Sequence, residues 1–282
     1  MMQLVDEVRD LPLTVSNVLA QVITECDNAD ASVSSLARIM AGDQALAAMV
    51  LKLANSAYYG YARKIESLPD AVVLLGFASV KNLAITASIT RLLTNNRDQY
   101  ADVRAALFDH SLCTAVTARI LGRSKRVSGE KAFVAGLLHD LGLIVLVCYR
   151  KDLFGKLQAA SDGAGADFHE VELDVLGFGH AELGALVAAE WKFPAALCEA
   201  LRFHHEPGAA LVDPMLTSTI HVADWAAKRV GVGLVPPAVP EWPAAASKDL
   251  FDLSDASVTR LESEIRAEFL DGESLRGVGR AA

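Results

Sequence analysis

The chain has few aromatic residues and no long apolar run, and each shortage limits the class of protein. Aromatic side chains make up 6% of the 282 residues, although hydrophobic residues make up 52%. Such an Ala-, Leu- and Val-rich composition favours helices that pack through small side chains. The longest apolar stretch, residues 141–149, is interrupted by Gly142 and is far shorter than the roughly 20 residues of a membrane helix. We therefore expect a soluble protein with a large buried core and no membrane partner.

An export signal, paired cysteines and clustered cations are also lacking. The first residues, MMQLVDEVRDLPL, contain neither a basic segment nor an apolar one. Cys26, Cys113, Cys148 and Cys198 are widely spaced, which is typical of reduced cysteines in an unexported protein. The net charge is −9, whereas nucleic acids and anionic lipids bind clusters of Lys and Arg. The sequence therefore predicts a cytoplasmic protein that binds no nucleic acid.

Apolar residues recur at helical spacing along most of the chain. Val15, Val18, Leu19, Val22 and Ile23 follow the i, i+3, i+4, i+7, i+8 pattern of one helix face. No segment alternates with period two, so we expect an all-α fold without strands. The stretch 231–243 contains four prolines and two glycines and predicts a linker. The helix pair within 32–55 could be a DNA-reading motif, but Lys52 is the one cation that its second helix offers.

Imidazole and carboxylate side chains form an ordered set in the second half of the chain. The set consists of His110, His139, Asp140, His180, His204, His205 and Asp224. These side chains are ligands that borderline and hard divalent cations choose. Neighbouring residues on a helix point about 100° apart, so His139 and Asp140 can share an ion only with ligands from other helices. A bound ion would relieve the cost of burying this pair, and so would a simple hydrogen bond between the two side chains.

The order H…HD…D resembles that of the HD superfamily of metal-dependent phosphohydrolases. By that resemblance His110, His139, Asp140 and Asp224 correspond to its core metal ligands. Further histidines between the HD pair and the last Asp resemble the two-metal branch, which includes the HD-GYP cyclic-di-GMP phosphodiesterases. The resemblance implies that His180, His204 and His205 add a second metal. The expected cofactors are then one or two divalent ions, of Fe, Mn, Ni, Zn or Mg.

The closer resemblance, over nearly the whole chain, is to the HDOD family (HD-related output domain). The motifs that carry it are Leu11-Pro12, residues 51–60 (LKLANSAYYG), 70–76 (DAVVLLG), 132–142 (AFVAGLLHDLG), 180–184 (HAELG) with Trp191 and Pro194, and His204-His205. The resemblance implies a two-lobed helical bundle. We expect an N-terminal helical lobe over 1–98, an HD-like lobe over 99–231, and a linker with a C-terminal helix over 232–282. It also implies a regulatory module of bacterial signal transduction that binds partner proteins without turnover, often in cyclic-di-GMP networks.

The chain departs from the enzyme pattern at two places. Leu143 stands where the HD-GYP branch carries a lysine, and Glu206-Pro207-Gly208-Ala209 follows His205 in place of Gly-Tyr-Pro. Phosphoryl transfer needs positive charge against developing negative charge, and no neighbour of the motif obviously supplies it. We therefore assign no catalytic residue. The alternative function is a metal-dependent phosphohydrolase acting on nucleotides or cyclic dinucleotides, which are also the expected small ligands.

Other candidate residues lie outside this set. We expect His169 to be a surface residue at a helix start. We expect His221 to be either a packed residue or one whose ring N–H orients a carboxylate ligand. Asn55, Tyr58, Tyr59 and Tyr61 belong to a predicted loop. Tyrosines are favoured interface anchors, so this loop is a candidate contact for a partner, although such tyrosines also pack back on their own domain.

Overall fold

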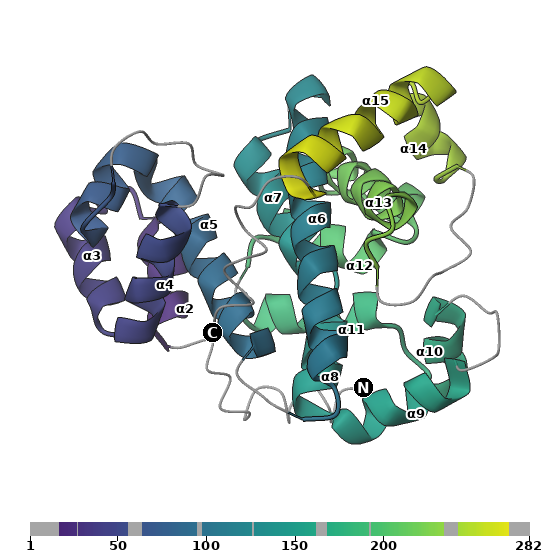
Figure 1. The fold of residues 1–282 in the computed structure, drawn as a ribbon, viewed down its shortest axis with the longest axis horizontal. Coiled ribbons are helices and arrows are strands. Elements are labelled where there is room, and N and C mark those ends of the chain that lie inside the picture. The colour runs from purple at the N-terminus through teal and green to yellow at the C-terminus, as the bar shows by residue number, and fades with distance from the viewer. Residues whose placement is uncertain are drawn as a thin grey trace. The chain divides into compact units, whose positions relative to one another are not determined.

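The described part of the chain is helical, as predicted. The computed structural model describes residues 17–26, 28–55, 64–94, 98–125, 127–161, 168–191, 193–233 and 242–270, and within these ranges it contains no strand. The helices divide between two compact units (Figure 1). One unit holds α2 to α5, and the other holds α6 to α15.

Short polar side chains cap two helices of the N-terminal unit at their N-termini. It contains α2 (Asn17–Cys26), α3 (Val33–Ala41), α4 (Gln44–Ala54) and α5 (Leu68–Thr94). Ser32 caps α3, and the Asp43 carboxylate accepts from the Leu46 N–H at the start of α4. Gly76 interrupts α5 with a φ of 82°, a left-handed value that glycine adopts readily. Arg91 of α5 binds Asp43 at 2.8 Å, so one carboxylate caps α4 and ties it to α5.

The amide of Asn55 closes the loop that we expected to contact a partner. Its Nδ2 donates to the carbonyls of Leu51 and Ile65, and its Oδ1 accepts from the Ile65 N–H, each at 2.8 Å. The two contacts to Ile65 join the two ends of the loop, and the contact to Leu51 holds the amide against the end of α4. Tyr58, Tyr59 and Tyr61 lie outside the described residues.

The C-terminal unit is a helical bundle whose long helix α6 packs against two others. Its helices are α6 (Ala101–Lys125), α7 (Gly129–Leu138), α8 (Leu141–Tyr149), α9 (Lys151–Ser161), α10 (Phe168–Leu176), α11 (His180–Glu190), α12 (Ala195–Phe203), α13 (Pro214–Arg229), α14 (Ala245–Leu250) and α15 (Asp255–Ile265), with short turns η1 (Pro207–Ala209) and η2 (Arg266–Leu270). The long helix α6 packs along α7 and α13. Helix α11 packs against α8 and α12, and α14 and α15 pack on α13. The histidines of the predicted ligand set lie on or next to α6, α7, α11 and α12 of this bundle.

Two segments are long and apolar enough to cross a membrane by composition, and both contribute to the cores of their units. In the most apolar window of Gly129–Tyr149, 94% of the residues are buried inside the fold, against 56% for Leu68–Leu93. The segment Gly129–Tyr149 is also divided by the turn at His139 and Asp140 between α7 and α8. The burial of Gly129–Tyr149 inside the fold accounts for its apolar composition.

Candidate metal centre

A close contact between α6 and α7 brings the first two histidines together. A Cβ at Gly136 of α7 would lie 2.7 Å from the Ala115 Cα of α6, a distance that only glycine avoids. The two helix backbones therefore touch. His139 directly follows α7, and His110 lies in the middle of α6. Their Nε2 atoms end 3.2 Å apart.

A second close contact, between α8 and α11, places His180 beside Asp140. A Cβ at Gly142 would lie 2.1 Å from the His180 carbonyl oxygen, and a Cβ at Gly184 would lie 2.9 Å from the Gly142 nitrogen. Asp140 precedes α8 and His180 begins α11. The motif His139-Asp140-Leu141-Gly142 thus supplies two side chains for the centre and the small residue that lets a further helix approach it.

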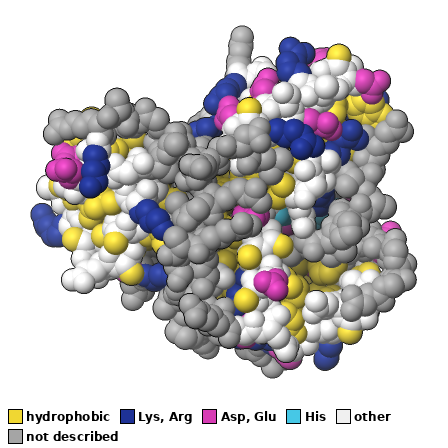
Figure 2. All heavy atoms as spheres, viewed as in Figure 1, with side chains coloured by type: hydrophobic (Ala, Val, Ile, Leu, Met, Phe, Trp, Pro, Cys, Tyr) yellow, Lys and Arg dark blue, Asp and Glu magenta, His cyan; other side chains and the backbone are white. Residues whose placement is uncertain are grey.

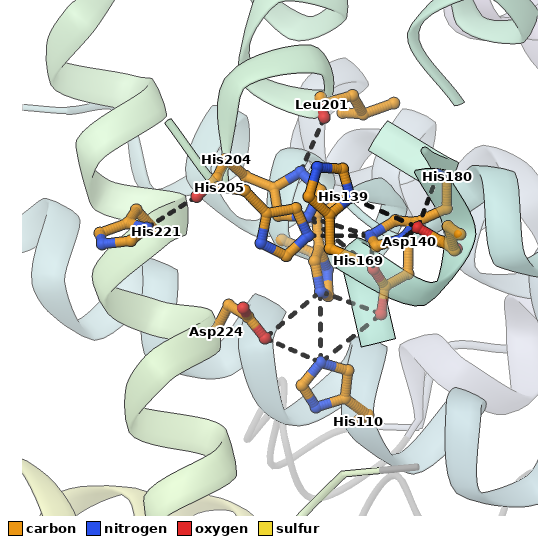
Figure 3. Close-up of polar contacts among 12 residues, drawn as sticks. His110, His139, Asp140, His169, His180, Leu201, His204, His205, His221 and Asp224 are labelled. Atoms are coloured by element: carbon orange, nitrogen blue, oxygen red, sulfur yellow. Dashed lines mark hydrogen bonds and ion pairs between the residues drawn. The ribbon is translucent and has the colours of Figure 1, made fainter. Parts of the chain in front are cut away.

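His139 and Asp140 do not share a helix, contrary to the arrangement considered above. They form the turn between α7 and α8, and Asp140 has φ −93° and ψ 23°, outside helical values. The turn changes the direction of the backbone, so both side chains point to the same interior point (Figure 3). The geometric obstacle posed by adjacent positions on one helix therefore does not arise.

Four side chains form the first ligand set, and their spacing suits one ion. Asp224 Oδ1 lies 3.0 Å from His110 Nε2, and Asp140 Oδ2 lies 3.2 Å from His139 Nε2. The cross distances, His110 to Asp140 and His139 to Asp224, are 3.6 and 3.7 Å. Ligands bound at about 2.1 Å to one ion lie about 3.0 to 3.4 Å from their neighbours in octahedral or tetrahedral geometry. The two shorter distances fit that spacing, and the two cross distances exceed it by a few tenths of an ångström.

The second ligand set contains three further histidines and the other oxygen of Asp140. Asp140 Oδ1 lies 3.2 Å from His180 Nε2 and 3.9 Å from His204 Nε2. His180 Nε2 in turn lies 3.0 Å from His205 Nε2 and 3.4 Å from His204 Nε2. The two oxygens of Asp140 therefore serve different sets, and this carboxylate lies between two candidate ion positions.

The Nδ1 atoms of four histidines are bound to acceptors outside the two sets. The acceptors are the carbonyl oxygens of Val232, Gly136 and Leu201 for His110, His139 and His204, at 2.7 to 2.9 Å, and Glu172 Oε2 for His180, at 2.6 Å. A carbonyl or carboxylate oxygen only accepts, so each Nδ1 carries the proton. In a neutral ring the Nε2 lone pair then points into the centre, which is the orientation of a metal-ligating imidazole.

The converging lone pairs and one unpaired oxygen indicate that the residues fit a divalent ion. The Nε2 atoms of His110 and His139 lie 3.2 Å apart, and those of His180 and His204 lie 3.4 Å apart. In neutral rings these pairs cannot hydrogen-bond, since neither nitrogen carries a hydrogen. Asp224 Oδ1 is buried and makes no hydrogen bond of acceptable geometry. A buried carboxylate oxygen without a partner is costly. A cation in each set would satisfy these atoms, so the cluster can hold metal.

In the absence of an ion, protons supply part of the missing positive charge. Burial works against the charged imidazolium of His139, but the Asp140 carboxylate outweighs it and raises the pKa of His139 to about 9. Burial also opposes the charge on His180, yet the Glu172 carboxylate raises the pKa of His180 to about 10. Burial and these neighbouring charges hold the pKa of His204 well below its usual range. One proton would then lie in each ligand set.

The aspartates remain ionised for the complementary reason. Burial alone would raise the pKa of Asp140, but the His139 charge and its hydrogen bond hold that pKa well below the usual range. Burial likewise opposes ionisation of Asp224, and the Lys228 ammonium outweighs it and lowers the pKa of Asp224. Both carboxylates are thus available as anionic ligands at neutral pH.

Two residues near the centre were not recognised from the sequence. Glu172 of α10 is fully buried and accepts from both the backbone N–H and the ring of His180. Lys228 lies one turn after Asp224 on α13 and binds its Oδ2 at 2.7 Å. The expectation that no cation lies near the motif was therefore wrong for this lysine. Its i, i+4 spacing from Asp224 was a visible signal, whereas nothing in the local sequence around Glu172 points to His180.

His169 and His221 both lie closer to the centre than the sequence suggested. His169 is in the first turn of α10, as predicted, but its ring stacks on His205 at 4.9 Å and its Nδ1 lies 3.4 Å from Glu172 Oε2. His221 donates from Nδ1 to the His204 carbonyl at 2.7 Å and accepts at Nε2 from the Ala244 N–H. It therefore orients a ligand, as expected, through the backbone of His204 rather than through a carboxylate. On the face that Figure 2 shows, little histidine surface is visible.

An all-helical unit with two ligand sets joined by an HD pair defines a protein of the HD superfamily. Within that superfamily, the model of the HDOD domain matches residues 11–207, about 70% of the chain. The chain belongs to the HDOD family and is a module related to signalling proteins. The match ends before Asp224, so the last ligand lies beyond the matched segment.

The similar proteins include one relative and several solved structures. A protein of Treponema pallidum (strain Nichols), named only as uncharacterized, is 29% identical over 225 residues, which cover 78% of this chain and 42% of the relative. The chain thus spans less than half the length of that relative.

The solved structures support the fold. A structure from Marinobacter aquaeolei VT8, whose name proposes a signal transduction protein, is 25% identical with a TM-score of 0.74, over 93% of this chain and 58% of that one. An HDOD domain protein of unknown function from Geobacter sulfurreducens is 24% identical with a TM-score of 0.70, over 94% and 86% of the two chains. A protein of Shewanella amazonensis SB2B, whose name proposes a phosphohydrolase, is 24% identical with a TM-score of 0.67, over 99% and 91%.

Proposed function

We propose that this HDOD domain is a metal-loaded regulatory module of signal transduction in the bacterial cytoplasm, which binds partner proteins without turnover. The observation that carries the metal is the pair of ligand sets that share Asp140, with the histidine tautomers fixed from outside. An ordinary buried His–Asp hydrogen bond needs one histidine and one carboxylate. It does not account for four imidazoles that direct lone pairs at two points.

The composition of the ligand sets narrows the choice of ion. Five of the seven side chains are imidazoles, which suit Zn, Fe and Ni, whereas Mg prefers oxygen ligands and retained water. We therefore favour Fe, Zn or Ni over Mg, with Mn between them.

Metal analysis of protein purified without chelator tests the proposal. We expect about two divalent ions per chain in the wild type by mass spectrometry of the metals. Asp140→Asn removes the anionic ligand that both sets share, and it should strongly lower the amount of metal bound in each set. Asp249→Asn, an exposed aspartate on α14, is the matched control and should bind as the wild type does. Trace metal alone in the wild type, even after incubation with Fe, Mn, Ni or Zn, would refute the metal centre.

A phosphohydrolase acting on nucleotides or cyclic dinucleotides is the second candidate. Asp140 between two ion positions and the Lys228 ammonium beside Asp224 both favour it. Paired divalent ions clamp a phosphate and activate water when bound. Against turnover, position 143 carries a buried leucine in place of the lysine of the enzyme branch. A panel of mono-, di- and cyclic nucleotides with each metal separates the two candidates, because turnover that Asp140→Ala abolishes would overturn the non-catalytic function.

The partner surface remains a prediction. Asn55, Tyr58, Tyr59 and Tyr61 are the residues that we expect at a protein contact. The Asn55 amide already hydrogen-bonds to Leu51 and Ile65. Asn55 would therefore hold the ends of the loop in place, and the tyrosines would contact the partner. A variant with the three tyrosines changed to Ser should lose the partner but keep its metal.

A further inference from the structure

A cavity of about 210 Å³ opens beside the second ligand set, and no step above uses it. Its walls include His169, Glu182, Arg202, Phe203, His205 and Glu206. We propose that this cavity binds the phosphate group of a small phosphate ester, with Arg202 and His169 as its contacts on the protein, and that binding requires the metal-loaded centre. The inference rests on the metal loading proposed above and adds where, and by which residues, a ligand is recognised.

His205 joins the cavity to the metal centre. It is the one member of the seven-residue ligand set that is partly exposed, while the other six are buried. Its Nε2 lies 3.0 Å from that of His180, inside the second set, and its ring also forms part of the cavity wall. A molecule in the cavity therefore reaches the side chains that hold the second ion.

His169 is held in place at the mouth of the cavity. Its ring stacks on that of His205 with an angle of 21° between the planes, and Glu172 contacts its Nδ1. One ring nitrogen of His169 lies within 4.8 Å of ligand nitrogens of His180 and His205. The ring is thus close enough to the second set to share a bound anion with it, and its position is fixed before any ligand arrives.

Arg202 supplies the side chain best suited to a phosphate. A guanidinium can donate two parallel hydrogen bonds to phosphate oxygens. Its pair with Glu182 is long, at 3.8 Å, and both side chains are well exposed, so the pair contributes little and can be exchanged for a ligand. The guanidinium lies 5.4 Å from the centre of the Phe203 ring, which steadies it at the cavity edge.

The charge balance makes anion binding depend on the metal. Five carboxylates, those of Asp140, Glu172, Glu182, Glu206 and Asp224, face two cations, Arg202 and Lys228. Without metal the region therefore carries three net negative charges with neutral histidines, and still one when His139 and His180 each hold a proton. Such a region repels phosphate. Two divalent ions add four positive charges and reverse the sign, whereas one ion does not. Phosphate should therefore bind only when both ion positions are filled.

The size and the apolar wall limit the ligand class. Ligand sites commonly have volumes of about 300 to 1,000 Å³, and about 210 Å³ accommodates a phosphate with an attached sugar rather than a whole dinucleotide. Phe203 and the half-exposed Leu173 form an apolar side on which a flat base can lie. The expected occupant is a nucleoside monophosphate, or one such end of a longer ligand.

Calorimetric titration of the metal-loaded, full-length chain tests this assignment. We expect inorganic phosphate and GMP to bind, guanosine to bind at least tenfold more weakly than GMP, and chelator-stripped protein to bind phosphate at least tenfold more weakly than loaded protein. Arg202→Ala should lower the affinity for GMP at least tenfold while the metal content stays unchanged. Arg202→Lys should restore part of that affinity. His169→Ala should also weaken GMP at unchanged metal content. Arg260→Ala, an exposed arginine on α15, is the control and should have no effect.

The outcomes separate this inference from the function it rests on. If the protein takes up two ions but Arg202→Ala and His169→Ala bind GMP as the wild type does, the cavity assignment is wrong and the metal centre stands. Loss of an ion in His169→Ala would make His169 a metal ligand and overturn its assignment as a phosphate contact. A wild type that takes up no metal overturns both proposals.

Discussion

At the residue scale, side chains that bind no ion decide whether this centre works. The lone pairs of the histidines point inward because each Nδ1 is held by an acceptor outside the ligand sets. Three of these acceptors are backbone carbonyls that any residue can supply. The fourth is the carboxylate of Glu172, a side chain that a substitution can remove. Glu172 is therefore the position at which one substitution tests orientation without removing a ligand.

Replacing Glu172 with Gln should lower the affinity for the ion of the second ligand set, which contains His180, more than the affinity for the ion of the first set. The neutral amide keeps a similar shape but loses the charge that makes the His180 imidazole a stronger ligand. Changes to such outer partners commonly cost about 10- to 100-fold in metal affinity. Competition titration with a chromophoric chelator measures both ions, and Glu170→Gln, exposed on the same helix, is the control. Equal affinities in the Glu172→Gln and Glu170→Gln proteins would show that Glu172 is only a packing residue.

At the element scale, helix contacts made by glycine bring the ligands together. Gly136 lets α7 touch α6, and Gly142 lets α8 touch α11. The first contact brings His139 to His110, and the second brings Asp140 to His180. The ligand sets thus depend on the distances between helix backbones as well as on ligand identity.

Gly142→Ala should damage the second ligand set selectively. Its new Cβ would lie 2.1 Å from the His180 carbonyl, so α8 and α11 must separate. Overpacking of this kind typically costs about 1 to 3 kcal/mol of unfolding free energy, and we expect weaker binding of the second ion with the first largely kept. Urea unfolding and metal analysis measure the two effects. Gly208→Ala, with open space around the new Cβ, is the control, and similar behaviour of the two variants would contradict the argument.

The same scale shows why part of the site was visible in the sequence and part was not. His110, His139, Asp140 and Asp224 could be assigned as ligand candidates because the order and spacing of a motif can be read directly from the linear sequence. Glu172 could not, since it reaches His180 through a turn between α10 and α11 that places its carboxylate at the helix start. The stacking of His169 on His205 likewise joins α10 to the end of α12, a contact that no periodicity predicts.

At the scale of the whole molecule, the buried protons make the stability of the metal-free protein depend on pH. The pKa values of His139 and His180 are raised to about 9 and about 10, so the folded state binds protons that the unfolded state releases above about pH 6.5. The stabilisation is fully present below pH 6.5 and is lost as the pH rises through 9 and 10. The lowered pKa values of His204 and His205 act oppositely, because their unfolded forms take up protons first as the pH falls below 6.5. The metal-free protein should therefore be most stable near neutrality.

Thermal unfolding of chelator-stripped protein between pH 5 and 10 checks this expectation. The melting temperature should fall between pH 7 and pH 9.5 in the stripped protein. It should change much less over that interval in the loaded protein, where metal has displaced the protons. Identical profiles for stripped and loaded protein would contradict the assignment of protons to the centre.

The sequence by itself determined the helical fold and the order of the metal-ligand candidates, because helical periodicity and motif spacing are local properties of the chain. Tertiary structure alone decided that Asp140 lies between two ligand sets, that the histidine lone pairs point inward, and that Lys228, Glu172 and His169 surround them. These features depend on how closely helix backbones approach and which carbonyl faces which ring. Such relations arise only when segments distant in the chain pack against one another.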